Sequence, residues 1–257
     1  MGLQRPAKDL GRTPARENSA WGCDRIQGAL ANVSYSISDT TVANILKAHS
    51  IEPAPDRQRT TSWSTFLKAH WDSLFSIDFT TTEIWTLRGL VTMSVLVVME
   101  LKTRRIEIAG ITASPDSAWI TQTARELTNG QDGFLRNASD LLMDRDTKFS
   151  PLRTFLKTCT DTKVVLLPPR SPNLNAHLER FMRSLKSECL DRMIFFGDQP
   201  LRRALTEFQT HYHHERNHQG LDNQVIDPGD EVGRTQGVLD CRERLGGLLR
   251  YDHRRAA

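Results

Sequence analysis

The sequence has few of the features that mark secreted or cysteine-stabilised proteins. Only four cysteines occur among its 257 residues, and no two of them form a C-x-x-C pair. Scattered cysteines argue against a disulfide framework and against a cysteine-rich zinc site. They favour a reducing compartment, so we expect a cytoplasmic protein.

Long apolar runs and common nucleotide-binding motifs are also missing. The longest apolar run, Leu90 to Leu101, is interrupted by polar residues, which leaves it too short to cross a bilayer. No apolar segment follows the first residues, so we expect neither a signal peptide nor a membrane partner. The sequence contains no G-x-x-x-x-G-K-[ST] loop and no G-x-S-x-G elbow, so ATP use and serine-hydrolase chemistry have no support.

The composition is that of an ordinary globular protein, with 38% hydrophobic and 25% charged residues. A chain of this length can bury a full core. The net charge of +3 and the pI near 8.7 permit nucleic-acid binding but do not demand it.

The N-terminal quarter of the sequence predicts short helices and flexible segments. Residues 1–20 have no apolar periodicity and predict a flexible N-terminus. Residues 21–51 predict two short helices, one around Ile26 to Leu30 and one capped by Ser38. This pattern fits a helix-turn-helix that binds DNA, and it fits a small packing subdomain equally well. Residues 52–65 are rich in Pro and Arg and predict a linker.

The main domain is expected at residues 66–222 and the C-terminal tail at residues 223–257. Apolar patterning predicts strands at 74–79, 87–99, 106–111, 141–143 and 164–167. It predicts helices at 114–127, with Ser114 as the cap, at 152–159, after 175, and at 201–214. Three strands followed by alternating helices and strands predict an α/β fold. The tail is either docked on this core or mobile.

The stretch from Pro168 to Leu190 predicts a helix with a charged flank. Glu179, Arg183 and Lys186 lie on one side at about 100° per residue, next to an apolar stripe that should be buried. A carboxylate followed by two cations suits a metal ion held beside a phosphate backbone. A solvated helix of ordinary charge would look similar.

Two further acids accompany secondary structure. Asp78 lies within the first predicted strand, where acids are depleted, and Asp144 closes a later strand. Phosphoryl transfer on DNA uses two divalent ions about 4 Å apart, and Mg²⁺ prefers carboxylate oxygens. Carboxylates on two strands and one helix could converge to provide them.

These blocks resemble a known family. S-I-D-F-T, L-M-D-R-D-T-K-F and S-P-N-L-N-A-H-L-E-R-F are similar, in this order, to the three blocks of the DDE integrase catalytic core, found in bacterial insertion-sequence transposases and retroviral integrases. H-Y-H-H-E-R-N-H-Q-G-L looks like the tail common in these transposases. The resemblance implies an RNase H-like fold with a mixed five-stranded sheet flanked by helices.

The resemblance also implies partners and chemistry. We expect cleavage and strand transfer of double-stranded DNA, at the element ends and the target. We expect two Mg²⁺ or Mn²⁺ ions, a homo-oligomer, and a location at the bacterial nucleoid. Two alternatives stay open: a metal-dependent nuclease on the same fold, and a truncated or inactive transposase fragment that only binds DNA.

The resemblance assigns site residues one by one. Asp78, Asp144 and Glu179 match the catalytic, metal-binding triad, and Lys186 matches a cation that contacts the transposon end. We expect Arg183, Arg170 and Asn175 to contact DNA as well.

Three departures from the family accompany this match. The spacing from Asp144 to Glu179 is one residue short, Asp146 replaces a usual glycine, and Lys148 stands where an acid is common. Asp146 would either crowd the metal site or act as an outer-shell ligand.

His211, His214 and His218 have a helical spacing that suits a transition metal. No cysteine or acid pattern completes that site, and we expect no zinc there.

Overall fold

The computed structural model describes residues 21–48, 67, 69–167 and 175–255. The chain divides into two compact units, Met1–Thr65 and Phe66–Ala257. No helix in the described ranges is long and apolar enough to cross a lipid bilayer.

The first unit contains two short helices, α3 (Cys23–Ala31) and α4 (Asp39–Ala48). Their apolar faces form a small core of Ile26, Leu30, Val42 and Leu46. Ser38 caps α4, since its hydroxyl accepts a hydrogen bond from the Thr41 backbone N–H at 3.2 Å, which confirms the predicted cap. DNA binding by this helix pair stays a prediction.

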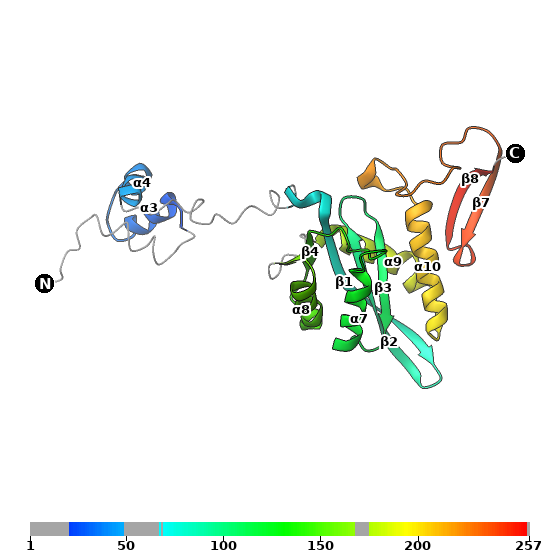
Figure 1. The fold of residues 1–257 in the computed structure, drawn as a ribbon. Helices are drawn as coiled ribbons and strands as arrows, with labels where there is room; N and C mark the ends of the chain where they lie inside the picture. The colour runs from blue at the N-terminus through cyan, green and yellow to red at the C-terminus, as the bar shows by residue number, and fades with distance from the viewer. Residues whose placement is uncertain (1–20, 49–66, 68, 168–174, 256–257) are drawn as a thin grey trace. The chain divides into compact units, whose positions relative to one another are not determined.

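The second unit is built on a mixed sheet in the order β3-β2-β1-β4-β5 (Figure 1). β1 pairs antiparallel with β2 and parallel with β4, and β5 continues the sheet in parallel. This arrangement confirms the predicted α/β fold. A sixth strand, the two-residue β6, pairs with the far end of β1 and was not predicted. The strands are β1 (Leu74–Thr86), β2 (Gly89–Glu100), β3 (Ile106–Thr112), β4 (Asp140–Met143), β5 (Lys163–Leu166) and β6 (Phe195–Phe196).

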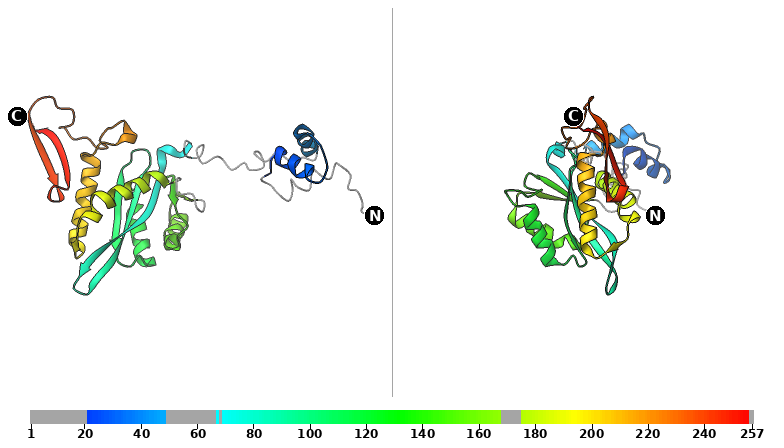
Figure 2. Two further views of the ribbon diagram at one scale, coloured as in Figure 1. Left: turned by 180° about the vertical axis from the view of Figure 1, so that it is seen from behind. Right: turned by 90° about the vertical axis from the view of Figure 1, so that its right-hand side faces the viewer.

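Helices cover both faces of this sheet (Figure 2). α7 and α8 lie on one face, and α9 and α10 lie on the other. Their bounds are α7 (Ser117–Leu127), α8 (Ser150–Cys159), α9 (Ala176–Glu188) and α10 (Asp198–His214).

The predicted cap of α7 is wrong. Asp116 caps the helix, because its side chain accepts from the Trp119 backbone N–H at 2.8 Å. Ser114 is held in a turn instead, where its backbone N–H donates to the Thr112 hydroxyl at 3.1 Å. A side-chain turn of this kind competes with helix formation and delays the helix start.

Alternation along β1 decides which side chains meet which helices. Phe75 and Ile77 belong to the core that α7 and α8 complete. Successive side chains of a strand point to opposite faces, so Ser76 and Asp78 face α9 and α10. The catalytic candidate Asp78 is therefore directed at the helix that carries Glu179.

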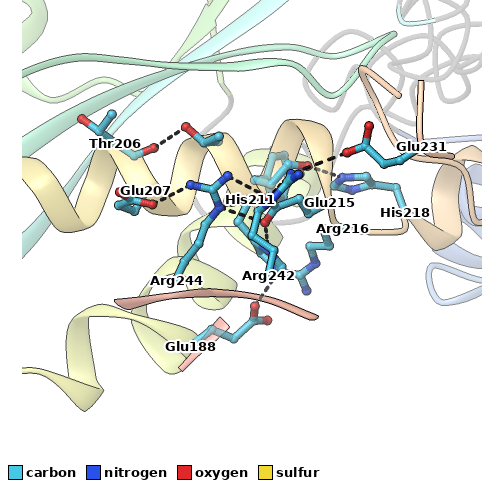
Figure 3. Close-up of polar contacts among 12 residues, drawn as sticks. Glu188, Thr206, Glu207, His211, Glu215, Arg216, His218, Glu231, Arg242 and Arg244 are labelled. Carbon is cyan, nitrogen blue, oxygen red and sulfur yellow. Dashed lines mark hydrogen bonds and ion pairs between the residues drawn. The ribbon is translucent and has the colours of Figure 1, made fainter. Parts of the chain in front are cut away.

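The C-terminal residues form a hairpin, β7 (Val238–Arg244) and β8 (Leu249–Arg255), that docks on α10. Glu215, just after α10, binds Arg244 and Arg242 of β7 (Figure 3). Its side chain is only 1% exposed. Of the two alternatives for the tail, the structure contains the docked one.

Candidate active site

Two of the predicted acids come from neighbouring parallel strands. β1 and β4 pair from Leu74 opposite Asp140 to Ser76 opposite Leu142. If this register is continued by two residues, Asp144 stands beside Asp78. Asp78 is half-buried and accepts from the Phe79 backbone N–H at 2.7 Å, whereas Asp144, just past the strand end, is exposed.

The third acid, Glu179, lies in the first turn of α9 and is half-buried. α9 packs against β1 through an apolar stripe that includes Leu178, Phe181 and Leu185. A carboxylate is favoured in the first turn of a helix because it faces the positive end of the helix dipole. Apolar packing of α9 thus sets the position of its one first-turn acid.

Electrostatics show that the three acids share one neighbourhood. Burial is the main cause that raises the pKa of Asp78 to about 6. The hydrogen bond from Phe79 acts against that rise, and the negative charges of Asp144 and Glu179 add to it. A carboxylate whose pKa is raised by burial and by neighbouring negative charges is stabilised in its charged form by a nearby cation.

The donor set fits a hard divalent ion, although its side chains do not yet enclose one. Among the described residues, no three His, Cys, Asp or Glu side chains stand close enough together to hold an ion. Asp78, Asp144 and Glu179 nevertheless offer only carboxylate oxygens, which Mg²⁺ and Mn²⁺ prefer. The raised pKa of Asp78, caused first by burial and further by the charges of Asp144 and Glu179, is the observation that fits a cation at this place.

Asp146 also belongs to this acidic neighbourhood. Its charge raises the pKa of Asp78 further, behind burial and the charges of Asp144 and Glu179. Its side chain accepts from the Lys148 backbone N–H at 2.9 Å and so caps a short 3-10 turn. Asp146 therefore has a local structural partner, and crowding of the metal site and outer-shell binding both stay predictions for it.

The cations predicted to contact DNA lie on α9 as expected. Arg183 is exposed and Lys186 is half-buried, both on the flank of Glu179. Within the described residues, neither forms an ion pair. Arg170 falls outside the described residues.

Asn175, the third residue predicted to contact DNA, is buried at the start of α9. Its side chain is 6% exposed, and its Oδ1 accepts a hydrogen bond of 2.5 Å from the Ser76 hydroxyl. The side chain connects α9 to β1 and does not face solvent. A DNA contact by Asn175 stays a prediction without support from this geometry, because its amide oxygen is already engaged inside the protein.

The three histidines at helical spacing each have another partner. His211 Nδ1 lies 3.0 Å from Glu215 Oε2, His214 Nδ1 lies 2.9 Å from the Asp227 carbonyl oxygen, and His218 Nε2 lies 2.8 Å from the Tyr212 carbonyl oxygen. These contacts hold the three imidazole rings against nearby protein oxygens.

Comparisons with known proteins extend the description of this site. Residues 160–225 match the family described as an integrase core domain. The catalytic core domain of BIV integrase is 16% identical, with a TM-score of 0.41, over 55% of this chain and 84% of that one. A chain of a simian T-cell lymphotropic virus intasome, in complex with PP2A regulatory subunit B56 gamma, is 12% identical, with a TM-score of 0.43. This similarity covers 95% of the present chain and 86% of that chain. No curated protein matches the sequence. The family match includes α9, with Glu179, and the whole of α10.

Proposed function

We propose that this chain, which carries an integrase core domain, catalyses metal-dependent cleavage and strand transfer of DNA. One observation carries the proposal most directly. β1, which carries Asp78, pairs in parallel with β4, which ends one residue before Asp144, and the charges of Asp144 and Glu179 both raise the pKa of the half-buried Asp78. Three carboxylates from a strand, a strand end and a helix supply the kind of ligand that two-metal phosphoryl transfer uses.

The reaction divides into two displacements at phosphorus. Water attacks a phosphodiester at the end of the mobile element and releases a 3′-OH. That 3′-OH then attacks a target phosphodiester, forming one P–O bond while the target strand leaves as a new 3′-OH. Bound Mg²⁺ or Mn²⁺ would supply Lewis-acid stabilisation of the attacking and leaving oxygens.

Each site residue has a defined task in this scheme. Asp78, Asp144 and Glu179 provide the oxygen ligands, and burial of Asp78 makes its carboxylate depend on a neighbouring cation. Lys186 and Arg183 follow Glu179 along the same flank and bind the phosphate backbone, which positions the DNA without reading its bases. Base recognition is assigned to α3 and α4, and pairing of two DNA ends calls for a homo-oligomer.

The decisive variant is Asp144→Asn. It keeps the size and polarity of an exposed side chain but removes a metal-binding charge, so folding and DNA binding should persist. Cleavage should fall by at least about 100-fold, because even an outer-shell partner of a metal ligand contributes about 10–100-fold. The matched control is Asp72→Asn, an 82% exposed acid near β1 whose only ion pair among the described residues is with Lys102.

The products distinguish the alternatives. Joined donor–target strands, made from a labelled donor oligonucleotide with Mg²⁺ or Mn²⁺, identify a transposase or integrase. Cleaved but never joined products identify a nuclease on the same fold. If the wild-type chain binds DNA without cutting it, the fragment hypothesis replaces the enzyme. If Asp144→Asn cuts as well as Asp72→Asn does, the assignment of the triad is wrong.

A further inference from the structure

A cavity of about 210 Å³ lies beside α9, on a different flank from Glu179. Three arginines line it, and each comes from a separate part of the chain. Arg104 lies in the turn between β2 and β3, Arg180 lies on α9, and Arg216 follows the end of α10. Sequence patterns could not bring these residues together, because more than thirty residues separate each from the next.

The positive charge of this cavity is only partly compensated. Arg216 Nη1 lies 2.7 Å from Glu188 Oε2 (Figure 3). Arg104 donates to the Leu101 carbonyl oxygen and lies over the Trp71 ring, 5.3 Å from its centroid. Within the described residues, neither Arg104 nor Arg180 forms an ion pair. Two guanidinium groups therefore face one cavity without a carboxylate partner.

Two aromatic side chains in the cavity wall strengthen the positive electrostatic field of the arginines. Phe181 and Tyr212 are 1% and 6% exposed, and their rings pack edge to face with centroids 4.8 Å apart. These rings form the apolar part of an otherwise polar wall. A cleft lined by charge of one sign attracts counter-ions more strongly than an open surface does. Burial lowers the pKa of Arg104, Tyr212 acts against that, and the nearby charge of Arg180 lowers it further. Like charges crowded in this way are stabilised by a bound anion.

The cavity and the catalytic candidates use two flanks of the same helix. His177, Arg180, Phe181 and Ser184 line the cavity at positions i, i+3, i+4 and i+7 of α9. Glu179, Arg183 and Lys186 lie about 140° further round at about 100° per residue. Exposed Arg180 of the cavity flank and exposed Arg183 of the catalytic flank are the members of the two sets that lie nearest each other, about 60° apart at about 100° per residue. A polyanion that crosses the exposed side of α9 can therefore contact Arg180 on the cavity flank and Arg183 and Lys186 on the catalytic flank.

We propose that this cavity binds a phosphate group of the DNA backbone, held by the guanidinium groups of Arg180 and Arg104. Guanidinium forks match the oxygens of a phosphate group in a bidentate manner. The inference rests on the proposed function, since the phosphate belongs to the DNA whose cleavage occurs at the other flank of α9. The site adds an anchor for DNA away from the triad.

The test uses the full chain and a short fluorescent DNA duplex, with affinity measured over a series of salt concentrations. Arg180→Gln removes an exposed side chain and should not disturb the fold. It should weaken binding about tenfold, as expected for a lost hydrogen bond to a charged group. It should also reduce the slope of log K against log salt by about 1, the signature of one lost phosphate contact. The matched control is Arg203→Gln, which removes an exposed cation from α10, outside the cavity lining.

A second measurement locates the ligand. Amide NMR signals of Ser184 and Gly220, which line the cavity, should shift when the duplex is added to the wild type and should not shift in Arg180→Gln. Circular dichroism of both variants checks that the fold is retained.

The possible results separate the cavity from the proposed function. Equal salt slopes for Arg180→Gln and Arg203→Gln would overturn the cavity assignment and leave the function standing. A wild-type chain that binds no duplex at any salt concentration would overturn both. If inorganic phosphate shifts the Ser184 and Gly220 signals while Arg180→Gln keeps the wild-type slope for DNA, the site takes free phosphate and the assignment to DNA is wrong.

Discussion

Ser76 and Asn175, 99 residues apart in the chain, share a hydrogen bond of 2.5 Å inside the protein. Ser76 stands two residues before Asp78 and on the same face of β1, because side chains alternate along a strand. Asn175 stands one helical turn before Glu179 at the start of α9. The bond therefore connects the strand and the helix directly beside two carboxylates that we assign to the metal site.

Breaking this bond should lower the rate of DNA cleavage while the protein stays folded. Ser76→Ala leaves the buried Asn175 amide oxygen without its partner, which costs about 1–3 kcal/mol of unfolding free energy. We expect cleavage to fall about tenfold or more, because outer-shell partners of metal ligands contribute about 10–100-fold. A rise in the Mg²⁺ concentration needed for half-maximal activity would identify a positioning role.

Two further variants make this prediction specific. Ser94→Ala removes a buried hydroxyl from the neighbouring β2 and should leave the metal dependence unchanged. The double variant Ser76→Ala/Asn175→Ala should lose less unfolding free energy than the sum of the two single variants, since both substitutions remove the same hydrogen bond. Strict additivity would show that the bond does not couple β1 to α9.

Glu215 should hold the C-terminal hairpin on α10. Burial alone would raise the pKa of Glu215, but hydrogen bonds from Arg244, His211 and Arg242 outweigh it and lower the pKa to about 2. Removing one partner of a buried ion pair costs about 3–5 kcal/mol, since the other charge stays behind. We expect Glu215→Ala to lower the unfolding free energy by about 3 kcal/mol in denaturant titrations, with faster hydrogen exchange in β7 and β8.

An exposed pair on the same hairpin supplies the comparison. Glu243 and Arg250 lie 3.0 Å apart with side chains 51% and 67% exposed. Exposed ion pairs contribute about 0–1 kcal/mol, so Glu243→Ala should have little effect. If the two variants lose the same stability, Glu215 is not the anchor of the hairpin.

His213 should make the stability of the second unit depend on pH. Burial is the main cause that lowers the pKa of His213 to about 4, against the opposing charge of Asp227. Its Nε2 accepts from the Ile106 backbone N–H at 3.0 Å, a bond that protonation would break. The unfolded chain takes up the proton first, near its usual pKa of about 6.5. The contribution of neutral His213 to the unfolding free energy is therefore complete above pH 6.5, and it falls by about 3 kcal/mol as the pH drops to 4.

The histidine can be replaced without losing its acceptor. His213→Gln offers an amide oxygen to Ile106 but cannot titrate, so unfolding free energy should depend less steeply on pH between 6.5 and 4. His214→Gln changes the exposed neighbouring histidine and should keep the wild-type slope. An unchanged slope in His213→Gln would exclude this histidine as the cause.

Gly110 should be intolerant of any side chain. A Cβ atom at this position would stand 2.6 Å from the Trp119 ring, which packs over β3. Overpacking of this kind costs about 1–3 kcal/mol, so thermal unfolding of Gly110→Ala should occur at a lower temperature. Gly130→Ala is the control, because its Cβ would meet no atom within 4 Å. Equal melting temperatures would mean that Trp119 moves aside without cost.

Much of the secondary structure follows from local patterns. The runs that become β2 and β3 and the stripe of α9 show their periodicity within a few residues. The Ser114 cap was predicted wrongly because two local hydrogen-bonding choices compete, and the turn with Thr112 prevails. The hairpin of β7 and β8 was missed because its strands are largely polar and exposed. Its docking depends on ion pairs that no apolar pattern reveals.

Local sequence patterns predict the kinds of elements and the mixed α/β class, and they nominate three acids for the site, because each depends on residues close together in the chain. Which side chains meet depends on the tertiary fold. Strand register pairs Ser76 with Leu142, two residues before Asp78 and Asp144, and the packing of α9 buries Asn175 against Ser76 and gathers Arg104 with Arg180. Such contacts depend on pairing between distant segments, where a shift of one residue turns every side chain to the other face, and local periodicity carries no information about that pairing.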